Sequence, residues 1–200
     1  MPTSTSRRTS WNASRRPSEA PLPGAERAGR LVPDAQPAPA GEPLYLGVDP
    51  GLAATGWGLI DGGARVVACG TVRTSPGPPA PRLLRIVDEL RAVLAEHPVE
   101  EAALEELFAG RNASSVIGVA QARGAVLAAL ASLGIPVHEY KPAQVKAVLT
   151  GYGMATKAQV TRMLALQAPV PGRLDDHAAD AVAIAICHAR SRRLHRLVAT

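Results

Sequence analysis

Four polar side chains stand at positions where they could bind metal ions. Asp49 and Glu105 each end a short apolar run, and His177 and Asp180 lie three positions apart in a segment with helical character. The spacing of the last two places both on one face of a helix. A carboxylate at the end of a buried strand is costly unless a cation or a donor satisfies it. Two such carboxylates and a His–Asp pair suit one or two hard divalent cations, which is the chemistry of phosphodiester hydrolysis.

The positive charge of the chain is unevenly placed. The formal net charge is +5. Residues 107–173 contain seven Lys or Arg and one acidic residue, Glu139, and residues 188–200 contain four Arg and no acidic residue. Acidic residues therefore gather around the candidate site, whereas separate stretches are basic. A basic surface beside an acidic metal site suits a nucleic-acid substrate, although a solvated helical face would have the same composition.

The composition divides the chain into three parts. Residues 1–42 are rich in Pro, Ala, Ser and Arg without a repeating apolar face, which predicts a disordered extension, either a real tail or the product of a mistaken start codon. Residues 43–190 are expected to form one domain, and residues 191–200 a basic C-terminal tail. No segment approaches the roughly 18 apolar residues of a membrane span. Cys69 and Cys187 are expected to be buried free thiols, which is typical of the reducing cytoplasm.

Apolar periodicity and turn residues predict alternating strands and helices. Strands are expected at residues 44–49, 56–60, 65–72, 99–105 and 135–140. Helices are expected at residues 82–96, 112–133, 142–150, 157–168 and 175–193. The run Asp61-Gly62-Gly63 predicts a hairpin between the second and third strands. This order indicates an α/β fold, a five-stranded mixed sheet with helices on both faces.

Four motifs carry a resemblance to a known family. They are GVDPGLAATG at 47–56, ALEELF at 103–108, QARG at 121–124 and HAADA at 177–181. In this order and at these spacings, residues 44–190 closely resemble the RuvC family of bacterial Holliday-junction resolvases. The resemblance implies a ribonuclease-H-like fold. The first motif alone is less specific, because similar Asp-x-Gly turns bind phosphate in actin-like ATPases and sugar kinases.

The resemblance also implies which residues form the active site. The catalytic set, which would also bind Mg²⁺ or Mn²⁺ as two ions per site, is Asp49, Glu105, His177 and Asp180. Many family members have Asp at the position of His177, and others have His. Asp176 is not expected to be a direct ligand, because on a helix it points about 100° away from its neighbour. Glu106 is expected to face the opposite side of the strand from Glu105 and to be structural or exposed to solvent.

Five further residues are expected to contact DNA. Phe108, the only Phe of the chain, follows Glu105 in a loop, where it could stack on an unpaired base at the crossover rather than pack in a core. Lys146 and Lys157 match the family's basic residues near the cleft and could stabilise the charged phosphate. Arg111 and Arg123 are further candidates for contacts to the DNA backbone.

The expected function is therefore that of a structure-selective endonuclease that resolves four-way DNA junctions by paired symmetric nicks. The two nicks require two active sites, which a two-fold homodimer would supply. The resemblance implies the RuvA–RuvB branch-migration complex as a partner and a cytoplasmic location. A ribosomal-RNA-processing nuclease of the same fold and a non-catalytic junction-binding protein stay open as alternatives. An actin-like ATPase or sugar kinase would need a second phosphate loop and a second domain.

Overall fold

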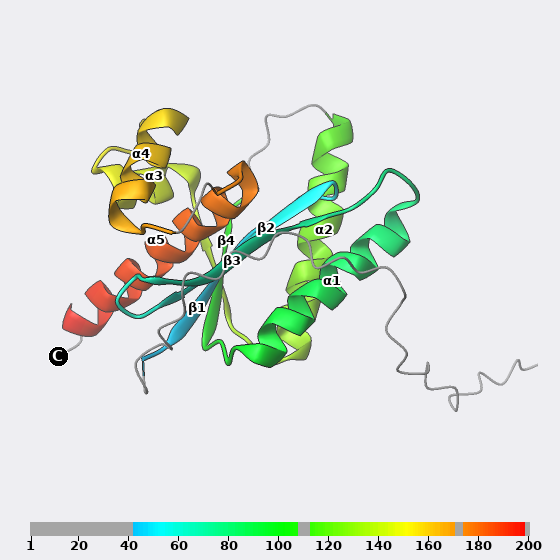
Figure 1. Ribbon diagram of the computed structural model, residues 1–200, viewed down its shortest axis with the longest axis horizontal. Coiled ribbons are helices and arrows are strands. Elements are labelled where there is room, and N and C mark those ends of the chain that lie inside the picture. Colours follow the sequence, from blue (N-terminus) through cyan, green and yellow to red (C-terminus); the bar gives the residue numbers. More distant parts are fainter. Residues whose placement is uncertain (1–41, 108–112, 171–173, 199–200) are drawn as a thin grey trace, which may run out of the picture.

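A computed structural model describes residues 42–107, 113–170 and 174–198 (Figure 1). The strands are β1 (Leu44–Asp49), β2 (Ala54–Asp61), β3 (Val66–Arg73), β4 (Glu101–Glu105) and β5 (Val137–Tyr140). The helices are α1 (Pro79–Glu96), α2 (Ala113–Ser132), α3 (Pro142–Thr150), α4 (Lys157–Gln167) and α5 (Asp176–Val198). The extension expected at residues 1–42 lies, apart from its last residue, outside the described ranges.

The strands form one sheet in the order β3-β2-β1-β4-β5. β2 pairs antiparallel with β1 and with β3, whereas β4 pairs parallel with β1 and with β5. The expected five-stranded mixed sheet is confirmed. Because β1, β4 and β5 run the same way, their carboxyl ends share one edge of the sheet.

The expected hairpin between β2 and β3 is also present. Asp61 is 2% exposed, and its Oδ1 accepts hydrogen bonds from the backbone N–H groups of Gly63 (3.1 Å) and Arg65 (2.9 Å). Its Oδ2 lies 2.9 Å from Nε of Arg65. A buried aspartate thus satisfies the turn's backbone donors, which explains why this turn closes the hairpin.

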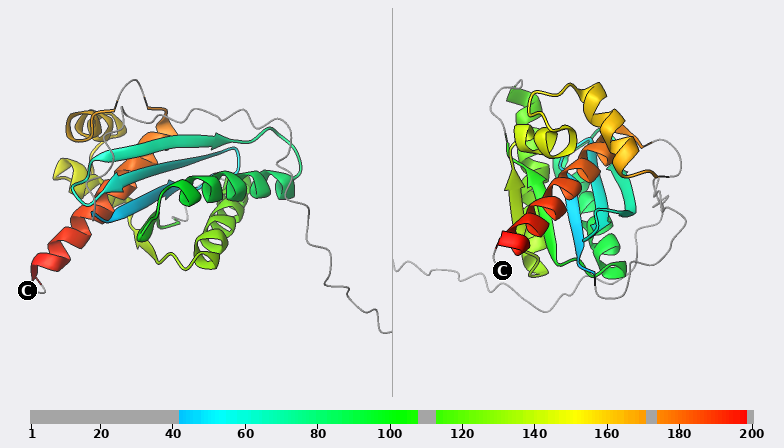
Figure 2. Two further views of the ribbon diagram at one scale, coloured as in Figure 1. Left: turned by 60° about the horizontal axis from the view of Figure 1, so that its bottom comes forward. Right: turned by 90° about the vertical axis from the view of Figure 1, so that its left-hand side faces the viewer.

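Helices cover both faces of the sheet, as Figure 2 shows. On one face, α1 and α2 place Ile86, Leu90, Val126 and Leu130 against Leu46 and Val48 of β1. On the other face, α3, α4 and α5 form a second core that includes Val145, Leu164, Ile184 and Tyr45. Because successive residues of a strand face opposite sides, β1 contributes to both cores and is apolar up to its last residue, Asp49.

Two expected helix boundaries are wrong by three residues or more. The last helix continues to Val198 rather than ending at Arg193, so the basic tail expected at residues 191–200 begins inside α5. The segment contains neither Gly nor Pro, and exposed Arg residues are good helix formers, so charge does not end the helix. In addition, α1 begins at Pro79 instead of Arg82, because proline is well tolerated in the first helical turn.

The two cysteines are buried and form no disulfide, as expected. Burial raises the pKa of both Cys69 and Cys187 to about 11, so both remain protonated at neutral pH. Within the described ranges, none of the helices combines the length and the apolar character that crossing a membrane requires.

Candidate functional site

Two of the candidate carboxylates end neighbouring parallel strands. Asp49 is the last residue of β1, and Glu105 is the last residue of β4. The register pairs Val48 with Leu104, the residues just before them, so the two carboxylates lie side by side at one sheet edge. Both strand interiors are buried, whereas the two terminal residues are partly exposed.

The helix α5 packs directly on the backbone of β1 and β2, which brings its first turn beside Asp49. A Cβ atom at Gly47 would clash with the carbonyl oxygen of Ala181, and one at Gly56 would clash with that of His177. The close approach of helix and sheet therefore requires glycine at both positions. Glycines in the strands thus decide where the polar start of α5 lies.

Asp175 fixes the start of α5, a role that the sequence reasoning missed. Its Oδ1 accepts hydrogen bonds from the backbone N–H of Ala178 (3.0 Å) and from the hydroxyl of Thr71 (2.7 Å), and its Oδ2 lies 3.4 Å from Arg73. Burial raises the pKa of Asp175, but these hydrogen bonds and the arginine outweigh burial and lower the pKa overall. An Asp just before an alanine-rich helix is an N-cap signal that could have revealed this role.

Replacing this cap is expected to destabilise the protein. Asp175→Ala should lower the free energy of unfolding by about 1 kcal/mol, because the N–H of Ala178 and the hydroxyl of Thr71 lose their acceptor. Asp175→Asn should lower the free energy of unfolding by less, because its amide oxygen can still accept the hydrogen bonds from Ala178 and Thr71. Urea denaturation of the three proteins measures the difference. Equal stability of Asp175→Ala and the wild type would mean that the cap contributes nothing.

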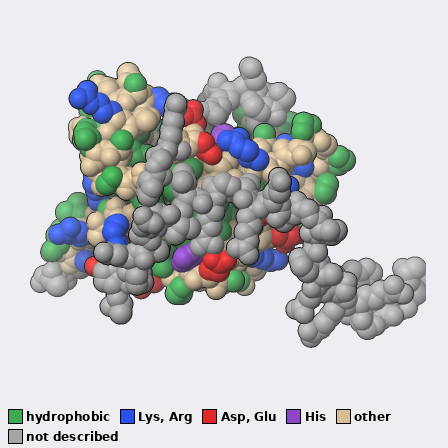
Figure 3. Space-filling model, viewed as in Figure 1, with side chains coloured by type: hydrophobic (Ala, Val, Ile, Leu, Met, Phe, Trp, Pro, Cys, Tyr) green, Lys and Arg blue, Asp and Glu red, His purple; other side chains and the backbone are tan. Residues whose placement is uncertain are grey.

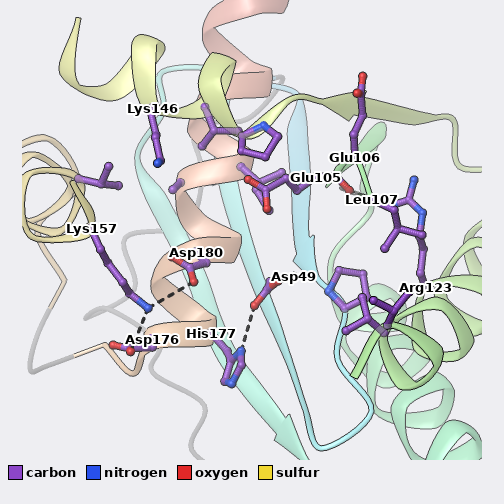
Figure 4. Close-up of a pocket in the computed structure, with 18 residues that line it drawn as sticks. Asp49, Glu105, Glu106, Leu107, Arg123, Lys146, Lys157, Asp176, His177 and Asp180 are labelled. Carbon is purple, nitrogen blue, oxygen red and sulfur yellow. Dashed lines mark hydrogen bonds and ion pairs between the residues drawn. The ribbon is translucent and has the colours of Figure 1, made fainter. Parts of the chain in front are cut away.

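The four catalytic candidates line one cavity of about 710 Å³ (Figure 4). In Figure 4, Asp49 and Glu105 point into this space from the sheet edge, and Asp180 points in from α5. His177 also lines the cavity, as do five further charged side chains: Glu106, Arg123, Lys146, Lys157 and Asp176. Residues from strands and helices far apart in sequence thus meet here, as the sequence predicted for the catalytic set.

His177 and Asp49 form a close pair in the cavity. Nδ1 of His177 lies 3.0 Å from Oδ2 of Asp49, and both side chains are partly exposed. A carboxylate next to an imidazole can orient the ring or share a cation with it. The pair joins the end of β1 to the first turn of α5.

Asp180 lies in an electrostatic environment that favours a cation. Burial raises the pKa of Asp180, and the negative charges of Asp49 and Asp176 raise it further, whereas Lys157 lowers it. Nζ of Lys157 lies 3.0 Å from Oδ2 of Asp176 and 3.7 Å from Oδ2 of Asp180. The hydrogen bond to Asp176 raises the pKa of Lys157, so the ammonium stays charged beside the two carboxylates.

The two lysines therefore differ in their surroundings. Lys157 is bound to the acidic side chains of α5, whereas Lys146 lines the cavity and forms no ion pair within the described part of the chain. Figure 3 shows basic side chains exposed over the region of α3 and α4, near acidic side chains and a histidine. Lys146 is thus the better placed of the two to meet a phosphate in the cavity.

The guanidinium of Arg123, a candidate for contact with the DNA backbone, is bound to protein groups in this structure. Its side chain is only 9% exposed, its Nη1 donates to the carbonyl oxygen of Glu105 at 2.8 Å, and its other nitrogen pairs with Glu139. Since Glu139 belongs to β5, Arg123 ties the ends of β4 and β5 together. Its guanidinium helps to position Glu105, and both of its terminal nitrogens are bound to other residues of this chain.

Glu106 borders the cavity, but in Figure 4 its side chain points away from that of Glu105, as the alternation of strand side chains led us to expect. Its backbone N–H donates to the carbonyl oxygen of Tyr140 at 2.9 Å, just beyond the end of β4.

The donors around the cavity fit a divalent cation. Three carboxylates and one imidazole match the ligand preferences of Mn²⁺, and the oxygens match those of Mg²⁺. The raised pKa of Asp180 shows that its negative charge is incompletely compensated. His177 and Asp49 are close, but no three of the four donors lie within 4.8 Å of one another. The one group of three His, Asp or Glu donors within 4.8 Å in the described part of the chain lies elsewhere, at Glu101, His138 and His188.

Phe108 and Arg111, which are expected to contact DNA, lie outside the described residues.

A mixed sheet of this order, with carboxylates from β1, β4 and α5 around one cavity, defines the class of ribonuclease-H-like nucleases. The family model described as crossover junction endodeoxyribonuclease RuvC matches residues 45–188. The chain therefore belongs to the RuvC family, which confirms the resemblance seen in the sequence.

Individual relatives agree with this assignment. The crossover junction endodeoxyribonuclease RuvC of Roseiflexus sp. (strain RS-1) is 50% identical over 149 residues, which cover 72% of this chain and 88% of that protein. Its counterpart in Chloroflexus aggregans is 51% identical over 151 residues, covering 72% and 91%. The solved structure of T. thermophilus RuvC in complex with Holliday junction substrate matches with a TM-score of 0.70 and 35% identity, covering 76% of this chain and 96% of that one.

Proposed function

We propose that this protein is a metal-dependent endonuclease that resolves four-way DNA junctions by paired nicks. The observation that carries the proposal is the meeting of Asp49, Glu105, His177 and Asp180 around one cavity in a member of the RuvC family. A relative with 35% identity has been solved in complex with Holliday junction substrate. Because all four donors are in place, the proposal favours catalysis over junction binding alone.

The residues that line the cavity would have different roles in the reaction. Asp49, Glu105, His177 and Asp180 would hold Mg²⁺ or Mn²⁺, with two ions per site as the proposed number. Bound divalent cations activate water and stabilise the charge on the phosphate and on the departing oxygen. Lys146 would contact the phosphate oxygens from α3, whereas Lys157 holds the acidic side chains of α5 in place. The products would be ends with 5′-phosphate and 3′-hydroxyl groups.

The proposed assembly is a two-fold homodimer. A junction is resolved only when two strands of like polarity are cut, and a symmetric dimer presents two identical sites. The RuvA–RuvB branch-migration complex is the proposed partner, and the cytoplasm is the proposed location.

The function is tested with purified protein on a synthetic mobile junction, with and without Mg²⁺ or Mn²⁺. We expect paired nicks at symmetric positions that depend on the metal. Linear duplex DNA of the same sequence and a structured ribosomal-RNA precursor serve as competing substrates. Cleavage of the RNA in preference would support the RNA-processing alternative. Binding to the junction without cleavage in either metal would support the non-catalytic one.

The metal preference should depend on His177. Imidazole is a poor ligand for Mg²⁺ and a good one for Mn²⁺, so we expect cleavage to be roughly tenfold faster in Mn²⁺ at equal concentration. His177→Asp should narrow that difference by improving the use of Mg²⁺. Initial cleavage rates of both proteins in both metals measure the effect. An identical preference in the two proteins would show that His177 is not a ligand.

Phe108 should help to open the junction at its crossover. Phe108→Ala is expected to bind junctions normally and to cleave them about 10–100-fold more slowly, because stacking on an unpaired base contributes roughly 1–3 kcal/mol. The loss should shrink on a junction whose crossover bases are already unpaired. Cleavage of the two junctions by wild type and variant gives the comparison. A loss of the same size on both substrates would assign Phe108 to packing.

A further inference from the structure

A second cluster of metal-binding side chains lies at the other end of the sheet. Glu101 begins β4, whose opposite end carries Glu105, and His138 belongs to β5. His188 lies on α5 eleven residues after His177, which is about 16 Å along a helix. This cluster is therefore separate from the proposed nuclease site.

The donor atoms of the cluster converge. Oε2 of Glu101 lies 2.9 Å from Nε2 of His188 and 3.4 Å from Nε2 of His138. One donor atom from each of the three residues lies within 4.8 Å of the others. Two ligands on a tetrahedral Zn²⁺, with bonds of about 2.0–2.1 Å, lie about 3.3–3.4 Å apart. The two separations from Oε2 of Glu101 match this value to within about half an ångström.

Two buried atoms of the cluster lack a hydrogen bond. The side chain of His188 is 0% exposed, and that of Glu101 is 16% exposed. Although Nε2 of His188 and Oε2 of Glu101 are close, neither makes a hydrogen bond of acceptable geometry. Leaving buried polar atoms unsatisfied is unfavourable, and a cation bound to both would satisfy them.

Neighbouring side chains hold the donors in orientation. The hydroxyl of Tyr140 lies 2.8 Å from Nδ1 of His188, which leaves Nε2 directed at Glu101. Arg192 binds Oε1 of Glu101 at 2.8 Å and thereby turns Oε2 toward the histidines.

We propose that Glu101, His138 and His188 form a second metal site, which binds a divalent cation of the Zn²⁺ class. Two imidazole nitrogens and one carboxylate oxygen select Zn²⁺ over Mg²⁺, which prefers oxygen alone. His138 is 37% exposed, so the ion can enter there and keep a water as its fourth ligand. The ion joins β4, β5 and α5 and strengthens the fold away from the nuclease site.

The test uses full-length protein that carries Asp49→Asn and His177→Ala, so that Zn²⁺ cannot bind the first site through these donors. Calorimetric titration should show one Zn²⁺ per chain. The melting temperature should rise by roughly 5–10 °C at a Zn²⁺ concentration about 100 times the Kd. Mg²⁺ at the same concentration should leave it unchanged. The absence of Zn²⁺ binding in this protein would overturn the proposal. Because this background is cleavage-deficient, the result does not depend on the nuclease function.

Variants of the cluster then locate the site. His138→Ala should weaken Zn²⁺ binding by more than about 100-fold, and Tyr140→Phe by about 10–100-fold through loss of the bond to His188. His195→Ala is the matched control. This exposed histidine lies on α5, the helix that carries His188, but outside the cluster. With the first site intact, His138→Ala should still cleave junctions in Mg²⁺, which shows that it folds. Equal Zn²⁺ affinity of the His138 and His195 variants would place the ion elsewhere and overturn the assignment.

Discussion

Asp49→Asn, Glu105→Gln and Asp180→Asn are each expected to slow junction cleavage by at least about 10³-fold while leaving junction binding within a few-fold of wild type. Each substitution removes one charged oxygen ligand from the cavity and keeps the size of the side chain. The basic side chains that would hold the phosphates are unchanged, so affinity should persist. Single-turnover cleavage and gel-shift binding on one junction measure both effects.

Glu106→Gln is the matched control for Glu105→Gln. Glu106 is the next residue of the chain and lines the same cavity, but it lies beyond the end of β4. We expect its loss of activity to be less than about tenfold, since it is outside the proposed ligand set. An equally large loss in both variants would show that total negative charge matters rather than ligand position. Loss of binding in step with cleavage in all three ligand variants would indicate structural roles for them.

Lys146→Gln is expected to reduce the cleavage rate by about 10²-fold. Lys146 lines the cavity without an ion pair among the described residues, so its ammonium is available to stabilise charge on the phosphate. Lys157→Gln should act differently, because Lys157 lowers the pKa of Asp180. Without this lysine the pKa of Asp180 rises further, so Asp180 is protonated at a higher pH. As the pH is lowered, Lys157→Gln should therefore lose activity at a higher pH than the wild type does. At alkaline pH the activities of the two proteins should differ less.

Cleavage rates against pH for both lysine variants separate the two roles. Arg162→Gln, which removes an exposed positive charge from α4 outside the cavity, controls for a general loss of attraction to DNA. A rate loss at every pH for Lys157→Gln, together with an unchanged pH profile, would give Lys157 the phosphate role instead. A normal rate for Lys146→Gln would exclude Lys146 from that role.

Local sequence patterns were sufficient to predict the elements and to single out the four candidate metal ligands. Apolar runs, periodicity and turn residues depend only on near neighbours, and they predicted the strands, the helices and the mixed sheet. Asp49 and Glu105 could be found because a carboxylate at the end of an apolar strand is conspicuous in sequence. The positions of element ends were less predictable. The end of α5 at Val198 was missed, because helix-forming residues continue past the last apolar turn.

The partners of the charged side chains were decided only by the tertiary structure. Sequence assigned Arg123 to DNA, but packing of α2 beside β4 and β5 buries its guanidinium against Glu139 and the carbonyl oxygen of Glu105. Likewise, the attachment of Lys157 to Asp176 depends on how α4 lies beside α5. Such contacts join residues with no periodic relation in the chain, so no local pattern encodes them.

The amino-acid sequence by itself thus determined which chemical groups end which elements, because strand and helix periodicities are short-range properties. Only the tertiary structure decided how closely α5 approaches the sheet. That distance is possible because Gly47 and Gly56 have no side chains. The need for glycine at these positions comes from a helix more than a hundred residues away in the chain. The same approach brings His177 to Asp49 at one end of α5 and His188 to Glu101 at the other. Long-range packing thereby assembles both polar clusters from residues whose neighbours in the sequence give no sign of these contacts.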